Sequence, residues 1–401
     1  MPPRLSGSAK AVLDVTVRRE TVLLPVTVFG WLFCAGAMAE TPAARPAPEQ
    51  LDLPTLQKQA GRGDAPAQFE LGKRYQHGQG VRKDPRRALG LYRQAAEQGH
   101  PPSINNLAAA YLMGDGVLRD EARAQALFER AAAGGNMVAQ HNLGLLLYRR
   151  GNAEADPLAF TRFTQAAQQG HIGAMRALVT LYSKGRGTER DYTAALSWMR
   201  KAEAAGCVSA KTDLAKAYQY GYGVPMDLPV AVALYRQAAE AGDVPAQHNL
   251  GVRYARGEGV PRDNAEALRW FRKAADQGFA RSLSALGTMY ASGAGVARDP
   301  SEAARLYRLA AERGDADGQT NLGRAYVEGK GVGADPVAAF VWLTLAARQN
   351  GTDAKADLAK LLPRLDAAQI GRGNAAVGRW RPQPASGKVG PSDRELGCEN
   401  G

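Results

Sequence analysis

The sequence predicts an all-α fold, a right-handed superhelical solenoid of stacked antiparallel helix hairpins. Three observations support this prediction. One pattern of residues repeats with a period of 36. Each copy contains two stretches with helical spacing of apolar residues, and a glycine-rich turn separates them. One hairpin cannot bury both faces of its helices, so consecutive copies must stack, and a constant rotation between them winds the stack into a superhelix.

Residues 244–278 show the repeating unit most clearly. Leu250 and Tyr254 belong to one apolar helical face in its first third, and Ala267 and Phe271 belong to another in its last third. Between them, two glycines allow positive φ angles and a proline prevents the first helix from continuing. The two helices are therefore expected to run antiparallel.

Eight copies of the unit follow one another along the chain. The repeat leucine occupies Leu71, Leu107, Leu143, Leu178, Leu214, Leu250, Leu286 and Leu322. A tyrosine follows four residues later in seven of them, at Tyr75, Tyr111, Tyr182, Tyr218, Tyr254, Tyr290 and Tyr326. The third copy has Leu147 instead and lacks the Gly-x-Gly-Val loop, and the fourth has Thr188 in place of the loop valine. We therefore expect altered packing, with a change of curvature or a contact site, within residues 145–190.

Each second helix is expected to begin after an aspartate, whose carboxylate accepts hydrogen bonds from free backbone N–H groups. These residues are Asp84, Asp120, Asp156, Asp191, Asp227, Asp263, Asp299 and Asp335. A glycine at the left-handed position should end seven of these helices. Those glycines are Gly99, Gly135, Gly170, Gly206, Gly242, Gly278 and Gly314.

The first 39 residues do not fit the repeat and are typical of a secretory signal peptide. A basic segment precedes an apolar run at 22–33, and Ala37-Met38-Ala39 supplies the small-x-small cleavage pattern. A membrane anchor is the alternative, but the run has about half of the ~20 residues that a spanning helix needs, and Pro25 interrupts it. We expect cleavage after Ala39, release to the periplasm or the medium, and no stable membrane anchor afterwards.

These patterns predict the domain organisation. It comprises a signal peptide at 1–39, a flexible segment at 40–50, the solenoid with an N-terminal capping helix at 51–350, C-terminal capping helices at 351–380 and a disordered tail at 381–401. Composition adds two constraints. Only three cysteines are present, and those after the signal, Cys207 and Cys398, are too few for one disulfide per hairpin. The net charge of +12 favours acidic partners, but no long run of like charges indicates nucleic-acid binding.

Taken together, these motifs resemble the Sel-one-like repeat family, a branch of the tetratricopeptide-type helical solenoids. The resemblance rests on Ala-x-x-x-Leu-Gly-x-x-Tyr-x-x-Gly-x-Gly-Val-x-x-Asp followed by Ala-Ala-x-x-Gly, and it extends from about residue 51 to 380. It implies a scaffold or adaptor that binds a protein or peptide partner on its concave face, often in bacterial envelope signalling or secretion. The alternative is a periplasmic hydrolase of the β-lactamase-like cysteine-rich subgroup, but the paired cysteines of that subgroup are missing here.

Catalytic motifs are not found. The five histidines do not form a His-x-x-x-His pair, and no Gly-x-Ser-x-Gly or Ser-x-x-Lys motif occurs. The Gly-x-Gly pairs follow helices and recur in most copies, unlike a phosphate-binding loop, which follows a strand. We therefore expect no catalytic residue, no metal site and no cofactor.

A binding site is better supported. The residue before the repeat leucine is asparagine in four copies, namely Asn106, Asn142, Asn249 and Asn321. An amide both donates and accepts hydrogen bonds, so these residues could hold the backbone of an extended peptide. Arg74 and Arg253 lie one helical turn further on and would favour acidic groups. The alternative role for the asparagines is a hydrogen bond within or between repeats that involves no ligand.

Overall fold

The computed structural model describes residues 47–349 and 351–383, and every regular element in these ranges is helical. The first helices of the eight hairpins are α2 (Ala65–His77), α4 (Pro101–Met113), α6 (Met137–Arg150), α8 (Ile172–Lys184), α10 (Val208–Tyr220), α12 (Val244–Arg256), α14 (Ala280–Ser292) and α16 (Ala316–Glu328). The second helices are α3 (Pro85–Glu97), α5 (Glu121–Ala133), α7 (Ala155–Gln168), α9 (Tyr192–Ala204), α11 (Leu228–Glu240), α13 (Asn264–Asp276), α15 (Pro300–Glu312) and α17 (Pro336–Arg348). The expected signal peptide lies outside the described residues, as does the expected tail beyond residue 383.

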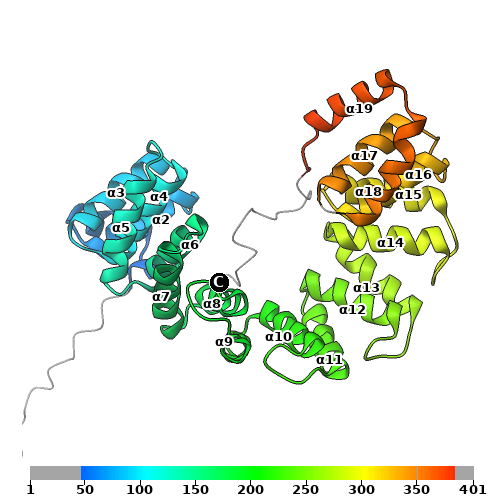
Figure 1. Cartoon of the computed structure of the whole chain (residues 1–401). Coiled ribbons are helices and arrows are strands. Elements are labelled where there is room, and N and C mark those ends of the chain that lie inside the picture. The colour runs from blue at the N-terminus through cyan, green and yellow to red at the C-terminus, as the bar shows by residue number, and fades with distance from the viewer. Residues whose placement is uncertain (1–46, 350, 384–401) are drawn as a thin grey trace, which may run out of the picture. The chain divides into compact units, whose positions relative to one another are not determined.

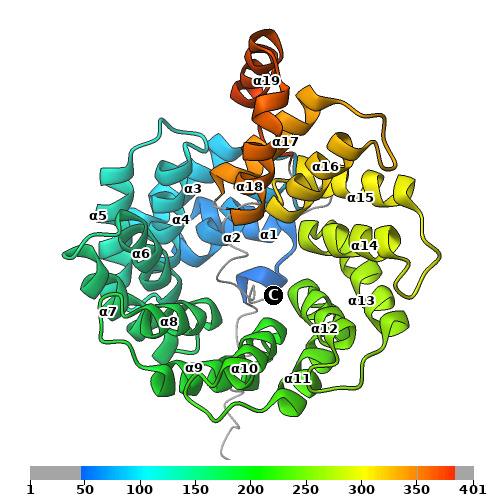
Figure 2. The same cartoon turned by 45° about the vertical axis from the view of Figure 1, so that its right-hand side comes forward.

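The hairpins stack in chain order, which confirms the predicted solenoid (Figure 1). Each second helix packs against the first helix of its own hairpin and against that of the next. Neighbouring first helices also contact one another, as α14 does with α16 and α16 with α18. The first helices therefore line the inner side of the stack and the second helices its outer side (Figure 2).

Additional helices flank the eight hairpins. At the N-terminal end lie η1 (Pro48–Gln50) and α1 (Leu53–Gly61), and at the C-terminal end lie α18 (Thr352–Leu361), η2 (Leu362–Arg364) and α19 (Ala367–Arg379). Trp380 packs edge-on against Trp342 of α17, with ring centroids 6.5 Å apart. The backbone N–H of Gln383 donates to the carbonyl of Glu312 at 2.7 Å, so the chain after α19 returns to the eighth hairpin.

The Leu-Gly pair of the repeat has a packing explanation. A Cβ atom added to Gly72 would lie 2.6 Å from the ring of Tyr92, and one added to Gly251 would lie 2.8 Å from the ring of Phe271. Both aromatic rings belong to the second helix of the same hairpin and are buried. The glycine therefore lets the aromatic ring reach the backbone of the first helix.

Seven of the eight expected aspartate caps are confirmed. The carboxylates of Asp84, Asp120, Asp191, Asp227, Asp263, Asp299 and Asp335 accept N–H groups from the first turn of the following helix. All seven expected C-terminal glycines have φ between +80° and +95°.

The prediction for Asp156 is wrong. In the third hairpin, α7 begins at Ala155, whose N–H is accepted by Asn152 at 2.7 Å, so Asp156 lies inside the helix. Its carboxylate instead accepts a hydrogen bond from Nε of Arg186, in the loop of the fourth hairpin, at 3.0 Å. The altered loop of the third copy therefore changes the junction between two hairpins.

Buried glutamines join second helices to first helices. Nε2 of Gln319 donates to the carbonyl of Ala311, and its Oε1 accepts from Gln349 at 2.9 Å. The side chain of Gln319 is completely buried. The same pair of bonds occurs at Gln68, Gln140 and Gln247. These amides satisfy each other in the core, which makes their burial tolerable.

Candidate binding groove

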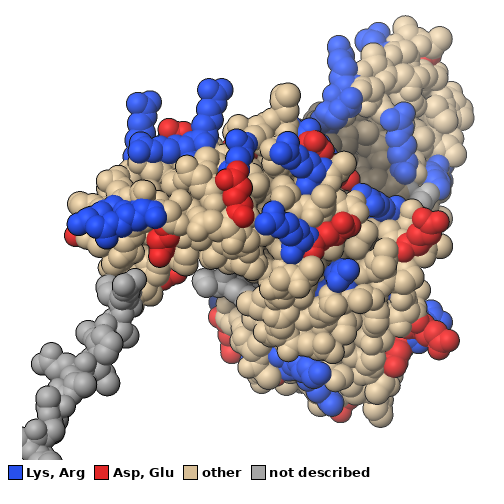
Figure 3. Space-filling view, turned by 90° about the vertical axis from the view of Figure 1, so that its left-hand side faces the viewer, with Lys and Arg blue, Asp and Glu red and all other residues tan. Residues whose placement is uncertain are grey.

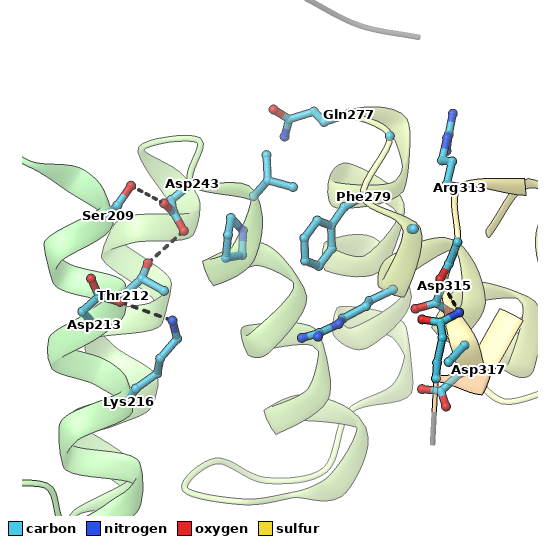
Figure 4. Close-up of a pocket in the computed structure, with 18 of the residues that line it drawn as sticks. Ser209, Thr212, Asp213, Lys216, Asp243, Gln277, Phe279, Arg313, Asp315 and Asp317 are labelled. Atoms are coloured by element: carbon cyan, nitrogen blue, oxygen red, sulfur yellow. Dashed lines mark hydrogen bonds and ion pairs between the residues drawn. The ribbon is translucent and has the colours of Figure 1, made fainter. Parts of the chain in front are cut away.

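A groove of about 1360 Å³ runs along the N-terminal ends of the first helices from α10 to α16. Its walls come from α10 and from the turns that precede α12, α14 and α16 (Figure 4). These turns place backbone and side chains beside one another because each second helix ends at a left-handed glycine and the next helix starts two residues later. The groove is thus a direct product of the repeat.

The α10 side of the groove is held by hydrogen bonds. Asp243 caps α12 by accepting the N–H of Ala246 at 2.8 Å. The same carboxylate accepts the hydroxyl groups of Thr212 at 2.8 Å and Ser209 at 3.0 Å (Figure 4). These three hydrogen bonds hold the Asp243 carboxylate in place at this end of the groove.

A second acidic group on this side forms ion pairs. Asp213 pairs with Arg176 of α8 at 3.3 Å and with Lys216 of α10 at 3.3 Å. Arg176 is mostly buried, and its Nε has no hydrogen-bond partner among the described residues. The cluster links two neighbouring hairpins at the floor of the groove.

The α14 side carries charges without partners. Within the described ranges, Arg281, Arg313 and Asp317 form neither an ion pair nor a side-chain hydrogen bond. Asp315 caps α16 through the N–H of Gly318, and burial raises the pKa of its carboxyl group. Four Lys or Arg and four Asp residues line the groove, so its attraction for acidic groups depends on Arg281 and Arg313.

A smaller recess of about 610 Å³ continues from the groove between α12, α14, α16 and α18. It shares Arg281 and Asp317 with the groove and adds Asn321 and Arg256. At the boundary, the ring of Phe279 lies 5.4 Å from that of His248. Burial, together with the charge of Arg281, lowers the pKa of His248 to about 4, so this histidine is neutral at physiological pH.

The expected asparagines have different surroundings. Asn142 donates to Oδ1 of Asn105 at 3.0 Å, and Asn105 in turn donates to Asn106 at 3.2 Å, so these residues connect α4 and α6. The side chains of Asn249 and Asn321 are half-buried and form no hydrogen bond within the described part of the chain. Only Asn321 lies in the groove system.

The two expected arginines both have intramolecular partners. Arg74 donates to the carbonyl of Leu51 at 2.8 Å and holds the chain that precedes α1. Arg253 is buried and pairs with Glu258 of its own loop. Their role in partner binding remains a prediction.

Sequence reasoning missed Arg281, Arg313 and Phe279. All three lie in or directly after the turns between hairpins. The residue that follows the C-terminal glycine varies from copy to copy, as His100, Asn136, His171, Cys207, Asp243, Phe279 and Asp315 show. That variability could have pointed to Phe279, which occupies a position where other copies carry a helix-capping side chain, as Asp243 and Asp315 do. It gives no signal for Arg281 and Arg313, which lie at other positions in or directly after the turns.

Comparison with known proteins identifies the repeat. The Sel1 repeat model matches eight segments, at residues 65–100, 101–136, 138–171, 174–207, 208–243, 244–279, 280–315 and 316–351. The chain belongs to the Sel1 repeat family. Members of this family are generally protein-interaction scaffolds with a helical solenoid fold. No curated protein matches the sequence significantly.

The solved structures that are similar to this Sel1 repeat protein include two with at least 30% identity. One is c5321, a protective antigen of uropathogenic Escherichia coli strains with an SLR fold, at 32% identity and a TM-score of 0.63 over 81% of this chain and 72% of the other. The second is a Sel1 repeat protein from Oxalobacter formigenes, at 30% identity and a TM-score of 0.57 over 77% of this chain and 89% of the other. Both support the solenoid assignment.

Two further properties of the described residues bear on function. None of their helices combines the length and apolar character that crossing a membrane requires. Lys and Arg side chains are spread over the surface shown in Figure 3 and are interspersed with Asp and Glu.

Proposed function

We propose that this protein is an exported scaffold that binds an extended segment of a partner protein in the groove along its first helices. The observation that supports this best is the groove itself, at about 1360 Å³. Pockets for small molecules usually measure about 300–1,000 Å³. A groove that is larger than this and crosses several repeats suits a polypeptide better than a metabolite.

The unpaired groups in the groove define the partner's chemistry. Arg281 and Arg313 would bind carboxylates, since their guanidinium groups form no ion pair or side-chain hydrogen bond within the described residues. Asn321 can bind the backbone of an extended peptide in the adjoining recess. Asn249, at the same helix position two hairpins earlier, would provide a second amide for the same purpose. We therefore propose a partner segment with acidic side chains.

Export is supported by the apolar run at 22–33 and the Ala37-Met38-Ala39 pattern. Intact-mass measurement of the protein recovered from its native host should give a chain that begins at Glu40. A full-length chain in the cytoplasmic fraction would contradict export.

The hydrolase alternative receives little support from the groove. Ser209 is the serine that lines the groove, and its hydroxyl group donates a hydrogen bond to Asp243. Within the described residues, no histidine or lysine forms a hydrogen bond with the Ser209 side chain. A nucleophilic serine needs an adjacent base. Stoichiometric acylation of Ser209 by a β-lactam would nevertheless restore the hydrolase assignment.

Affinity capture tests the groove directly. The mature protein, used as bait in an envelope extract, should retain a partner, and Arg281→Glu should reduce the recovered amount at least tenfold, because it reverses a charge that the partner's carboxylates face. Arg93→Glu is the matched control, since Arg93 is exposed on α3. Equal loss in both variants would show that total charge, and not the groove, determines binding.

A further inference from the structure

The third hairpin contains a recess that the regular hairpins fill. It has a volume of about 180 Å³ and lies between α5, α6 and α7. Leu143, Leu147 and Ala155 line it and are themselves buried. Leu158, which is 52% exposed, also lines it. The recess lies within the segment 145–190 for which the sequence predicts altered packing or a contact site.

The regular hairpins show what this space normally holds. In the sixth, seventh and eighth hairpins, the tyrosine that follows the repeat leucine reaches the second helix of the preceding hairpin. The hydroxyl groups of Tyr254, Tyr290 and Tyr326 accept hydrogen bonds from arginines 18 residues earlier, at 2.9, 3.1 and 3.0 Å. In the third hairpin the tyrosine position is Leu147, and the arginine position is Glu129.

The neighbouring tyrosine does not compensate for this change. The ring of Tyr148 lies under the guanidinium group of Arg186, 3.9 Å from its centroid, and its carbonyl accepts a hydrogen bond from the same arginine at 2.9 Å. Tyr148 is therefore held at the junction with the fourth hairpin. The space left by Leu147 remains open to solvent.

The chemistry at the edge of the recess is also changed. Glu129 uses one carboxylate oxygen to accept the amide of Gln125 at 2.8 Å. Its other oxygen has no hydrogen bond within the described residues. Arg150 and Arg162 also line the recess, and the guanidinium group of Arg150 donates to Oε1 of Gln125. At the position from which the regular hairpins offer a donor to a tyrosine oxygen, this hairpin offers the free acceptor of Glu129, which suits the O–H of a tyrosine that arrives from outside.

We propose that the recess binds the aromatic side chain of a partner protein, and that it prefers tyrosine to phenylalanine because Glu129 accepts the phenolic O–H. The inserted ring would occupy the space that the repeat tyrosine fills elsewhere. A rigid aromatic side chain in a preformed apolar recess is the usual form of an anchor residue at a protein interface. This inference rests on the proposed scaffold function only in taking the partner to be a protein.

Small aromatic probes test the recess without the partner. The full mature chain is titrated with p-cresol, the analogue of the tyrosine side chain, and with toluene, that of phenylalanine, and binding is followed by ligand-observed NMR. Wild-type protein should bind p-cresol saturably and more tightly than toluene. Leu147→Tyr should raise the melting temperature and abolish saturable p-cresol binding, because the chain then fills its own recess.

Two variants serve as controls. Tyr254→Leu should create a comparable recess in the sixth hairpin and add a second p-cresol site. Glu129→Leu should weaken p-cresol about tenfold, the loss expected for one charge-assisted hydrogen bond, and leave toluene unchanged. Arg281→Glu, which changes the groove, should leave the binding of p-cresol and toluene unchanged. The result for the recess is therefore independent of the result for the groove.

Two results would overturn the inference. The recess is not an aromatic site if Leu147→Tyr binds p-cresol as wild type does, or if wild type shows no saturable binding up to the solubility limit. Equal binding of toluene and p-cresol would overturn the tyrosine preference and the role of Glu129.

Discussion

Single buried residues hold neighbouring hairpins together in ways that the repeat pattern does not display. The repeat is defined by leucine, glycine, tyrosine and aspartate, but the links between hairpins also include glutamine pairs and stacked histidines. His141 and His171 stack with their ring centroids 4.3 Å apart at the junction of the third and fourth hairpins. Nε2 of His141 is buried without a hydrogen bond within the described ranges. Substitutions of these residues should therefore change the stability of the protein in specific ways.

Gln319→Ala should lower the free energy of unfolding by about 1–3 kcal/mol, because it removes two hydrogen bonds of a completely buried side chain, one to the carbonyl of Ala311 and one from Gln349. Chemical denaturation followed by circular dichroism measures the change. Gln79→Ala, in an exposed loop, is the control and should have almost no effect. Equal stability of the two variants would contradict the structural role of the buried pair.

Acid should destabilise the protein through His141. Burial, reinforced by His171, lowers the pKa of His141 to about 3 in the folded state, whereas the unfolded value is about 6.5. Between these values the unfolded chain binds more protons, so this contribution is present above pH 6.5 and is lost as the pH falls towards 3. The loss is at most about 1.4 kcal/mol per pH unit.

His141→Phe keeps an aromatic ring in the stack and should flatten the dependence of the melting temperature on pH between 6.5 and 4. An unchanged slope would show that His141 does not carry this effect.

At the scale of the element, the hairpins with a Gly-x-Gly loop, apart from the first hairpin, touch the preceding hairpin through that loop. The second glycine of the Gly-x-Gly loop has positive φ and lies against the backbone at the start of the previous second helix, as Gly259 does against Leu228. The glycine is therefore required both by its positive φ angle and by the close approach of the neighbouring backbone. Comparing two loops separates these two effects.

Gly259→Ala should destabilise the protein more than Gly80→Ala. Both residues have positive φ, of +74° and +69°, so each alanine carries the left-handed penalty of about 1–2 kcal/mol. Only at Gly259 would the new Cβ also lie 2.6 Å from the carbonyl oxygen of Leu228, whereas Gly80 has open space. Thermal unfolding of the two variants measures the difference. Equal melting temperatures would mean that this loop does not hold adjacent hairpins together.

The period, the hairpins and seven of the eight caps could be predicted from sequence because each copy presents the same local chemistry. The prediction failed at Asp156 because the third loop is rebuilt: Asn152 takes over the cap and Asp156 is drawn to Arg186. The expected site was harder to predict. Helical offset indicates which face Asn142 occupies, but it does not show that a neighbouring hairpin provides a partner for it.

At the scale of the whole molecule, the stack turns variable inter-hairpin turns into one surface. Arg281, at the start of α14, and Arg313, in the turn before α16, lie 32 residues apart in the sequence, yet they line the same groove. A repeat search does not reveal them because each position is occupied differently in the other copies. The proposed function therefore depends on the turns, while the fold depends on the constant helix residues.

The central claim is that a partner protein binds in this groove, and site-specific photo-crosslinking tests it most directly. A photoreactive amino acid at Asp317, exposed in the groove, should form a covalent adduct with a partner protein in the native envelope fraction, and the same residue at Ser301, exposed on the second helix α15, should not. Both variants should retain the wild-type melting temperature. An adduct from Ser301 alone, or none from Asp317 in a folded protein, would contradict the account.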